Sequence, residues 1–135
     1  MQDIKNIEPR ILGEKIVDVI YRKKGKNIEL INVEAQTSVT EYYVIATGNS
    51  RTQISAIRDE VDVKLTEWGV APYRIEGRGN GTWELLDFGS VIVHIFSREA
   101  RDFYKLEHLW ADAEKIDVTP ILDRIDAENA APVGE

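Results

Sequence analysis

The chain has 135 residues, a formal net charge of −7 and 43% apolar residues, which places it in the size range of one globular domain. The longest stretch without Asp, Glu, Lys or Arg, residues 88–97, is much shorter than the roughly 18 residues that a membrane-spanning helix needs. The absence of cysteine excludes disulfides, a thiol nucleophile and zinc sites built on thiolates. Because the first residues show no basic and then apolar leader, we expect a cytoplasmic protein without a membrane contact.

Charge is unevenly distributed along the chain. Seven acidic and two basic residues follow Ala111, giving this end a net charge of −5, whereas the rest carries −2. Binding to a nucleic-acid backbone depends on Lys and Arg, so this balance argues against a stand-alone nucleic-acid binder and favours a protein partner or a small ligand. The basic cluster Arg22, Lys23, Lys24 and Lys26 is interpreted as a helix end and a solvated turn, with at most a minor contact to RNA phosphates.

In the first half of the chain, the pattern predicts a helix, two strands and a second helix. Pro9 suits a first helical position, the apolar stripe of residues 9–24 follows helical spacing, and Gly25 is expected to end the helix in the left-handed conformation. Residues 28–33 and 42–47 are rich in branched and aromatic side chains, which indicates strands. Ser50 is the predicted N-cap of a helix over residues 51–68, with Gln53 completing a capping box.

In the second half, two strands at 73–76 and 83–86 flank a glycine-rich hairpin loop, and a tight turn leads into a buried strand at 91–96. Ser97 then caps a third helix that continues to residue 110. The predicted fold is therefore α/β, with a mixed sheet of about five strands covered by helices. Residues 1–112 form one domain. Residues 113–135 are expected to be an acidic, partly disordered tail, in which a few apolar side chains (Ile116, Val118, Ile121 and Leu122) can dock locally and residues 129–135 are disordered.

Candidate catalytic residues were tested by their spacing. A nucleotidyltransferase-like site needs two carboxylates at i and i+2 on one strand to hold magnesium, but Glu84 and Asp87 are three residues apart, and the acidic residues at 59–62 lie in a helix. The Gly48 turn lacks the lysine of a phosphate-binding loop and is interpreted as a plain turn. His94 is expected to be a buried, hydrogen-bonded side chain rather than a catalytic base. No set of side chains has the spacing of a metal site.

The segment after Ser97 contains more large apolar side chains than one helical stripe can bury. Phe103, Tyr104, Leu106, Leu109 and Trp110 all fall within it, so part of this apolar surface is expected to face outward. Arg, Tyr and Trp are also the residue types that dominate the energetics of protein interfaces. Two interpretations stay open, an interface or a Trp110 that folds back onto the body.

Several motifs together resemble the ribosomal silencing factor family, also called Iojap-like. The first is the run Tyr43-Val44-Ile45-Ala46-Thr47-Gly48-Asn49-Ser50, and the second is the pair Glu76-Gly77 followed by Trp83. The third is the run Leu86-Asp87-Phe88-Gly89 with Val91-Ile92-Val93-His94. The last is Arg101-x-Phe-Tyr104-x-Leu106-Glu107-x-Leu109-Trp110. The resemblance covers about residues 8–112. Glu41 and Ser90 depart from the residues usual in the family, and the acidic end extends beyond the usual length.

The resemblance implies a nucleotidyltransferase-like α/β domain without the catalytic carboxylates, and hence a protein that is not an enzyme and needs no cofactor. It further implies a translational repressor that binds the large ribosomal subunit at ribosomal protein L-fourteen, sterically blocks joining of the small subunit, and often forms a homodimer. The expected partner-binding residues are Trp83, Asp87, Arg101, Tyr104, Lys105, Glu107, Leu109 and Trp110, with the alternative that Arg101 and Glu107 form internal pairs that only orient the aromatic side chains. Two alternatives stay open, a nucleotide-binding transferase and a dimeric module for another partner.

Overall fold

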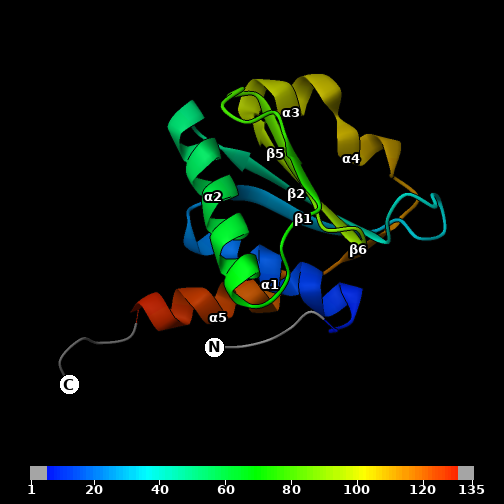
Figure 1. Ribbon diagram of the computed structural model, residues 1–135, viewed down its shortest axis with the longest axis horizontal. Coiled ribbons are helices and arrows are strands. Elements are labelled where there is room, and N and C mark those ends of the chain that lie inside the picture. Colours follow the sequence, from blue (N-terminus) through cyan, green and yellow to red (C-terminus); the bar gives the residue numbers. More distant parts are fainter. Residues whose placement is uncertain (1–5, 131–135) are drawn as a thin grey trace.

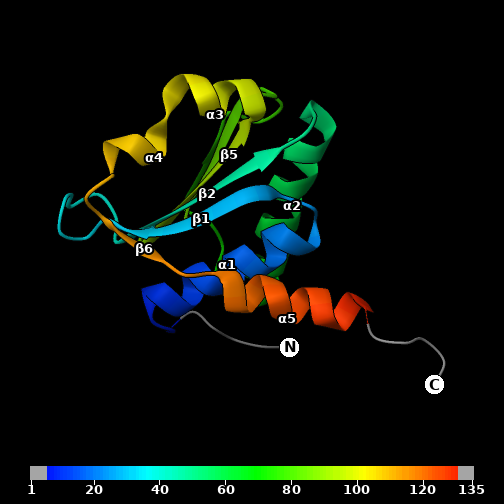
Figure 2. The same ribbon diagram turned by 180° about the vertical axis from the view of Figure 1, so that it is seen from behind.

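The computed structural model describes residues 6–130, which form a sheet with helices on both faces (Figure 1). In chain order the elements are α1 (Pro9–Arg22), β1 (Lys26–Asn32), β2 (Tyr42–Gly48), α2 (Arg51–Glu67), β3 (Arg74–Glu76), β4 (Trp83–Asp87), β5 (Val91–Ser97), α3 (Arg98–Tyr104), α4 (Leu106–Leu109), β6 (Glu114–Ile116) and α5 (Thr119–Ala130). Figures 1 and 2 show α1, α2 and α5 on one side of the sheet and α3 with α4 on the other. The predicted α/β class is confirmed.

The sheet has six strands in the order β3-β4-β5-β2-β1-β6, one more than the predicted number of about five. β2 pairs in parallel with β5, and the other strand pairs are antiparallel. The five predicted strands are all present, and the predicted hairpin joins β3 to β4. The additional strand, β6, lies at the edge beside β1, where Leu30 pairs with Ile116.

The main core lies between the sheet and the layer of α1, α2 and α5. It is built from the apolar stripes of the helices and from alternate side chains of the strands, including fully buried Ile16, Leu30, Val44, Leu65 and Ile95. Because a strand exposes successive side chains on opposite faces, the other residues of the same strands point toward α3 and α4. None of the helices in residues 6–130 is long and apolar enough to cross a membrane.

The capping box predicted at Ser50 and Gln53 is present, whereas the end of α1 differs from the prediction. The Ser50 hydroxyl accepts the Gln53 amide at 3.0 Å, and the Gln53 side-chain oxygen accepts the amide of Asn49, so the capping box is confirmed. At the end of α1, however, Lys24 rather than Gly25 takes the left-handed conformation, with φ of 72°. Gly25 is instead needed for packing, since a Cβ at this position would lie 2.3 Å from the side chain of Ile20.

The segment predicted as a partly disordered tail is largely ordered. β6 joins the sheet, and α5 packs against α1, burying Ile121 and Ile125. Tyr21 donates a hydrogen bond to Asp126 at 2.8 Å, and Arg124 forms an ion pair with Asp18 at 2.8 Å. The ordered fold therefore continues past residue 112 to residue 130. Of the stretch predicted to be disordered, residues 129 and 130 belong to α5 and residues 131–135 lie outside the described part.

Candidate partner-binding surface

Aromatic rings gather on the sheet face beneath α3 and α4. On β5, His94 and Phe96 point to this face, and the strand register places Trp83 of β4 beside Phe96. The ring centroids of Trp83 and Phe96 are 4.9 Å apart, those of Trp83 and His94 5.8 Å, and those of His94 and Tyr43 on β2 5.0 Å. Three neighbouring strands thus carry one continuous layer of rings.

The helical cover over this layer is short and broken. Ser97 caps α3 as predicted, its hydroxyl accepting the Ala100 amide at 3.1 Å. The single helix predicted to continue to residue 110 is wrong, because Lys105 adopts a left-handed conformation with φ of 49° and α4 begins after it. The break allows Tyr104 to pack on Trp83 at 4.8 Å between ring centroids and Trp110 to pack on Tyr43 at 5.5 Å. One straight helix would direct a single stripe toward the sheet.

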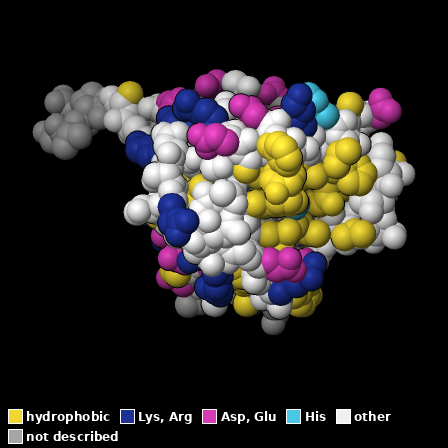
Figure 3. Space-filling view, turned by 90° about the horizontal axis from the view of Figure 1, so that it is seen from above, with side chains coloured by type: hydrophobic (Ala, Val, Ile, Leu, Met, Phe, Trp, Pro, Cys, Tyr) yellow, Lys and Arg dark blue, Asp and Glu magenta, His cyan; other side chains and the backbone are white. Residues whose placement is uncertain are grey.

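The incomplete cover leaves a large apolar area in contact with solvent. Phe103 is 80% exposed, Leu109 72% and Tyr104 49%. Half-buried neighbours complete what we call the aromatic surface, which comprises Trp83, Phe103, Tyr104, Leu106, Leu109 and Trp110. Figure 3 shows hydrophobic side chains gathered on the face where α3 and α4 lie. A contiguous exposed apolar area of this kind is typical of interaction sites in proteins.

His94 lies buried below the aromatic surface. Its Nδ1 accepts a hydrogen bond from the Trp83 indole at 3.0 Å, as expected for a buried, hydrogen-bonded histidine. Burial lowers the pKa of His94 to about 4, so the imidazole is neutral at pH 7. Since Nδ1 is the acceptor, the ring proton is on Nε2.

Two buried N–H groups at this site have no hydrogen-bond partner within the described residues. They are His94 Nε2 and the indole nitrogen of Trp110. Buried donors are generally satisfied in native proteins, by protein groups or by ordered water. Both donors lie buried beneath the exposed apolar area, where the described residues offer them no acceptor.

Arg101 was expected at the interface, but its side chain is only 8% exposed. It forms an ion pair with Glu29 at 3.0 Å and donates hydrogen bonds to the Asn27 carbonyl at 2.6 Å and the Thr47 hydroxyl at 2.9 Å. The guanidinium thereby ties α3 to β1 and β2. Sequence reasoning identified the residue but not its direction, because a helical stripe alone does not show which side faces the sheet.

The remaining predicted site residues are spread over two places. Asp87 lies at the opposite end of β4 from Trp83, where its carboxylate accepts the Gly89 amide at 2.8 Å and pairs with Arg74 at 3.1 Å. It shapes the turn before β5 and is separate from the aromatic surface. Lys105 is exposed at the break between α3 and α4, and Glu107 is part of α4.

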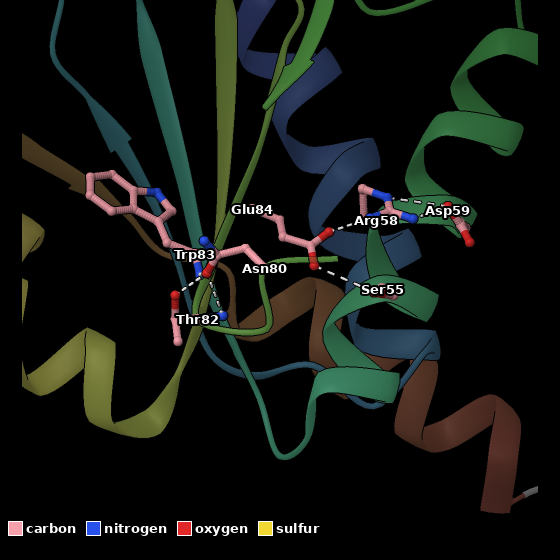
Figure 4. A network of polar contacts seen from close by, with 7 residues as sticks. All are labelled: Ser55, Arg58, Asp59, Asn80, Thr82, Trp83 and Glu84. Atoms are coloured by element: carbon pink, nitrogen blue, oxygen red, sulfur yellow. Dashed lines mark hydrogen bonds and ion pairs between the residues drawn. The ribbon is translucent and has the colours of Figure 1, made fainter. Parts of the chain in front are cut away.

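The carboxylate pair considered for catalysis is split between two environments. Glu84 is fully buried on the face opposite Trp83, and Figure 4 shows it pointing toward α2. There it forms an ion pair with Arg58, while the Ser55 hydroxyl donates to its other oxygen at 3.4 Å. Asp87, three residues along, faces its own turn. Within residues 6–130, no three His, Asp or Glu side chains are grouped so that they could hold a metal ion.

Phe103 and Leu106 of the aromatic surface, and Tyr43 beneath it, are not among the expected partner-binding residues. Phe103 carries the highest exposed fraction of the aromatic surface, and Tyr43 supports Trp110. The excess of large apolar residues after Ser97 was the available signal for Phe103. Tyr43 had no such signal, since it belongs to a strand that reads as buried on both faces.

Comparison with known proteins shows which family this chain resembles. Residues 6–133 match the family described as "Ribosomal silencing factor during starvation". A ribosomal silencing factor of Halalkalibacterium halodurans is 31% identical over 106 residues, covering 78% of this chain and 91% of the relative. A mouse relative, "Mitochondrial assembly of ribosomal large subunit protein 1", is 31% identical over 72% of this chain and 44% of its own length.

A solved structure shares the fold. The crystal structure of a protein from Chromobacterium violaceum superposes with a TM-score of 0.76 at 34% sequence identity, covering 78% of this chain and 88% of that one. The match to the family spans nearly all of the sequence, including β6 and α5. The chain belongs to the ribosomal silencing factor family.

Proposed function

We propose that this protein is a cytoplasmic translational regulator that binds the large ribosomal subunit through its aromatic surface. The partner is ribosomal protein L-fourteen, and the bound factor occupies space that the small subunit needs for joining. The names of the bacterial and mouse relatives support an association with the ribosome. The family resemblance of the α3–α4 motif supports the partner and the steric mechanism.

The observation that carries the proposal is the aromatic surface itself. Exposed apolar area costs free energy in water, and Phe103, Tyr104 and Leu109 would recover that cost only by contact with another molecule. The rings below them are held in place by strand pairing and mutual packing, so the surface is formed before a partner arrives. Preformed aromatic anchors are typical of the residues that dominate binding energy.

We infer that only part of the expected residue set contacts the partner directly. Trp83, Tyr104, Leu109 and Trp110 belong to the aromatic surface together with Phe103, and exposed Lys105 lies beside it at the break between α3 and α4. Arg101 and Asp87 act by positioning α3 and the turn after β4. A steric mechanism requires only affinity and position, so it needs no catalysis and no cofactor.

Co-sedimentation with purified large subunits tests the proposal. The double variant Phe103→Ala/Leu109→Ala removes the two most exposed side chains of the aromatic surface. We expect at least about tenfold weaker binding, since interface anchors each contribute about 1–3 kcal/mol. The matched control is Tyr73→Ala/Val39→Ala, which removes an aromatic and an aliphatic side chain of similar exposure (82% and 67%) elsewhere on the molecule. Equal co-sedimentation of both variants would place the interface elsewhere.

Subunit joining is measured separately by light scattering after small subunits are added. The wild-type protein should slow or prevent the rise in scattering, and Phe103→Ala/Leu109→Ala should not. Binding without any effect on joining would leave ribosome association in place and contradict the steric mechanism.

A further inference from the structure

Three segments that are distant in the sequence meet at one edge of the sheet. They are the turn after α1, the turn between β2 and α2, and the junction of β5 with α3. Lys26 pairs with Thr47 across β1 and β2, Gly48 pairs with Ser97 across β2 and β5, and the Gln53 side-chain amide donates to the Lys24 carbonyl at 3.1 Å. This edge is where the two parallel strands end and α2 begins.

These segments bring together five exposed cations. We call them the basic edge: Lys23, Lys24, Lys26, Arg51 and Arg98. None of the five forms an ion pair with another described residue. Many other cations are engaged by neighbouring acids, as Arg22 is by Asp18 and Glu128. The basic edge therefore keeps its full positive charge available, although the chain as a whole carries −7.

The acidic side chains near this edge are mostly occupied. Glu29 is shared by Arg101 and Lys115, each at 3.0 Å, and Glu128 is bound to Arg22. Glu99 and Asp102 on α3 are the nearby acids without an ion pair among the described residues. Five free cations beside two free acids leave a local positive excess.

The backbone that carries the basic edge is fixed. The buried Arg101 guanidinium holds the Asn27 carbonyl and the Thr47 hydroxyl, which joins the turn after α1 to β2 and α3. A fixed backbone presents these side chains to an extended polyanion without any rearrangement of the fold. The positive end of the α2 dipole points to the same place and adds to the field.

The basic edge also adjoins the aromatic surface. Arg51 lies over Gly81, since a Cβ at that glycine would be 2.7 Å from the Arg51 Nε. Gly81 in turn lines an open hollow with Phe103 and Tyr104. A partner seated on the aromatic surface therefore has the Arg51 end of the basic edge beside it.

We infer that the basic edge binds the phosphate backbone of ribosomal RNA next to the protein partner of the aromatic surface. This inference rests on the proposed binding to the large subunit and adds a second, electrostatic contact. Lysines and arginines that lack acidic partners suit phosphates, and their spread along an edge suits an extended backbone rather than one small anion. A near-neutral body with one such edge gives modest, salt-dependent affinity.

A short RNA duplex tests the inference without the ribosome. A fluorescent 20-base-pair duplex is titrated at about 50 mM salt with the full chain and two charge-matched variants. Lys23→Gln/Lys26→Gln/Arg51→Gln neutralises the basic edge, and the control Arg10→Gln/Lys64→Gln/Arg74→Gln removes three cations at the opposite ends of α1, α2 and the sheet. We expect the basic-edge variant to bind at least about tenfold more weakly and the control to bind within about twofold of wild type. Equal affinities for the two variants, or no binding by wild type, would overturn the inference.

Large-subunit binding at several salt concentrations separates this inference from the proposed function. The slope of log affinity against log salt should become shallower by about 2–3 in the basic-edge variant, at roughly 0.7–0.9 per lost phosphate contact, and remain unchanged in the control. Absence of large-subunit binding by wild type would contradict the proposed function, while the duplex titration would still decide RNA binding. A shallower slope on subunits combined with no duplex binding would show that the edge meets an acidic protein surface, which also overturns the RNA contact.

Discussion

Arg101 contributes to the stability of the fold because its side chain points into the protein and not toward solvent. Its guanidinium is buried and satisfies Glu29, the Asn27 carbonyl and the Thr47 hydroxyl at once. Removing one member of a buried charged network leaves the others without partners, which costs about 3 kcal/mol or more. We therefore expect Arg101→Ala to lower the free energy of unfolding by about 3 kcal/mol, measured by urea denaturation.

The neighbouring Arg98 is the control for this prediction, since it is exposed and lies in the same helix. Arg98→Ala should change stability by no more than about 0.5 kcal/mol. If the two variants unfold at the same urea concentration, the network around Arg101 does not stabilise the fold.

His94 makes stability depend on pH. Its pKa is lowered by burial from 6.5 to about 4 in the folded state, so the unfolded chain binds the proton more readily. The neutral imidazole gives its full contribution to stability above pH 6.5. As the pH falls from 6.5 to about 4, the folded protein loses about 3 kcal/mol of this stability. We expect the free energy of unfolding of wild type to fall more steeply over this range than that of His94→Gln, which has no imidazole to protonate.

His108 provides the comparison, because it is exposed. The same substitution there, His108→Gln, is the control, and every profile is measured by urea denaturation at intervals of half a pH unit. Parallel profiles for wild type and His94→Gln would mean that His94 is not the titrating group.

At the scale of elements, local signals predicted most of the fold. Pro9, the Ser50 and Gln53 capping box and the Asn-Gly hairpin each depend on a few neighbouring residues, and the helices and strands they mark are present. β6 and α5 were missed because their stability comes from distant partners, as when Leu30 pairs with Ile116. The break at Lys105 was missed for a related reason, since lysine has no preference for the left-handed region and tertiary packing of Tyr104 and Trp110 imposes it.

The break between α3 and α4 can be tested at Lys105. A non-glycine residue in the left-handed conformation costs about 1 kcal/mol, and glycine avoids most of that cost while losing some through its larger unfolded-state entropy. Lys105→Gly should therefore raise the free energy of unfolding by about 0.5 kcal/mol, whereas Lys105→Val should lower it by about 1 kcal/mol. Thermal denaturation of the three proteins gives the order, and a more stable Lys105→Val would indicate a continuous helix instead.

The contribution of α5 can be tested at Ile125, which is 1% exposed and packs in the main core. Truncating a buried isoleucine to alanine costs about 2–5 kcal/mol when its surroundings cannot collapse. We expect Ile125→Ala to destabilise the whole domain by at least 2 kcal/mol, and Leu122→Ala, on the partly buried side of the same helix, to cost less. Urea denaturation with tryptophan fluorescence measures both, and an unchanged midpoint for Ile125→Ala would show that the helix is dispensable for the domain.

In the molecule as a whole, the two surfaces proposed to bind partners lie outside the main core that stabilises the fold. The main core lies on the side of α1, α2 and α5, the aromatic surface lies on the side of α3 and α4, and the basic edge lies at the ends of β2 and β5. Changes to Phe103, Leu109 or the exposed cations can therefore alter binding without loosening the core. Most of the acidic excess is carried by the segment after residue 111, which includes α5, on the far side of the sheet.

The aromatic surface can also bind a second copy of the chain. We therefore expect a homodimer formed through this surface. Burying Phe103, Tyr104 and Leu109 of both copies would remove the largest exposed apolar side chains from water. Light scattering should give a mass that rises from one chain toward two as concentration increases, and Phe103→Ala/Leu109→Ala should remain at one chain. A mass of one chain for wild type at all concentrations would contradict dimer formation.

Because the same side chains are proposed to contact the ribosome, dimer formation and ribosome binding compete. The fraction of protein able to bind a large subunit is then the monomer fraction, so apparent affinity weakens as protein concentration exceeds the dimer dissociation constant. Titrating fixed large subunits with wild type should give a saturation curve that is flatter than a single-site isotherm, whereas a dimer formed through another face would leave the isotherm unchanged. Tyr73→Ala/Val39→Ala should reproduce the flattened curve, because it leaves the aromatic surface intact.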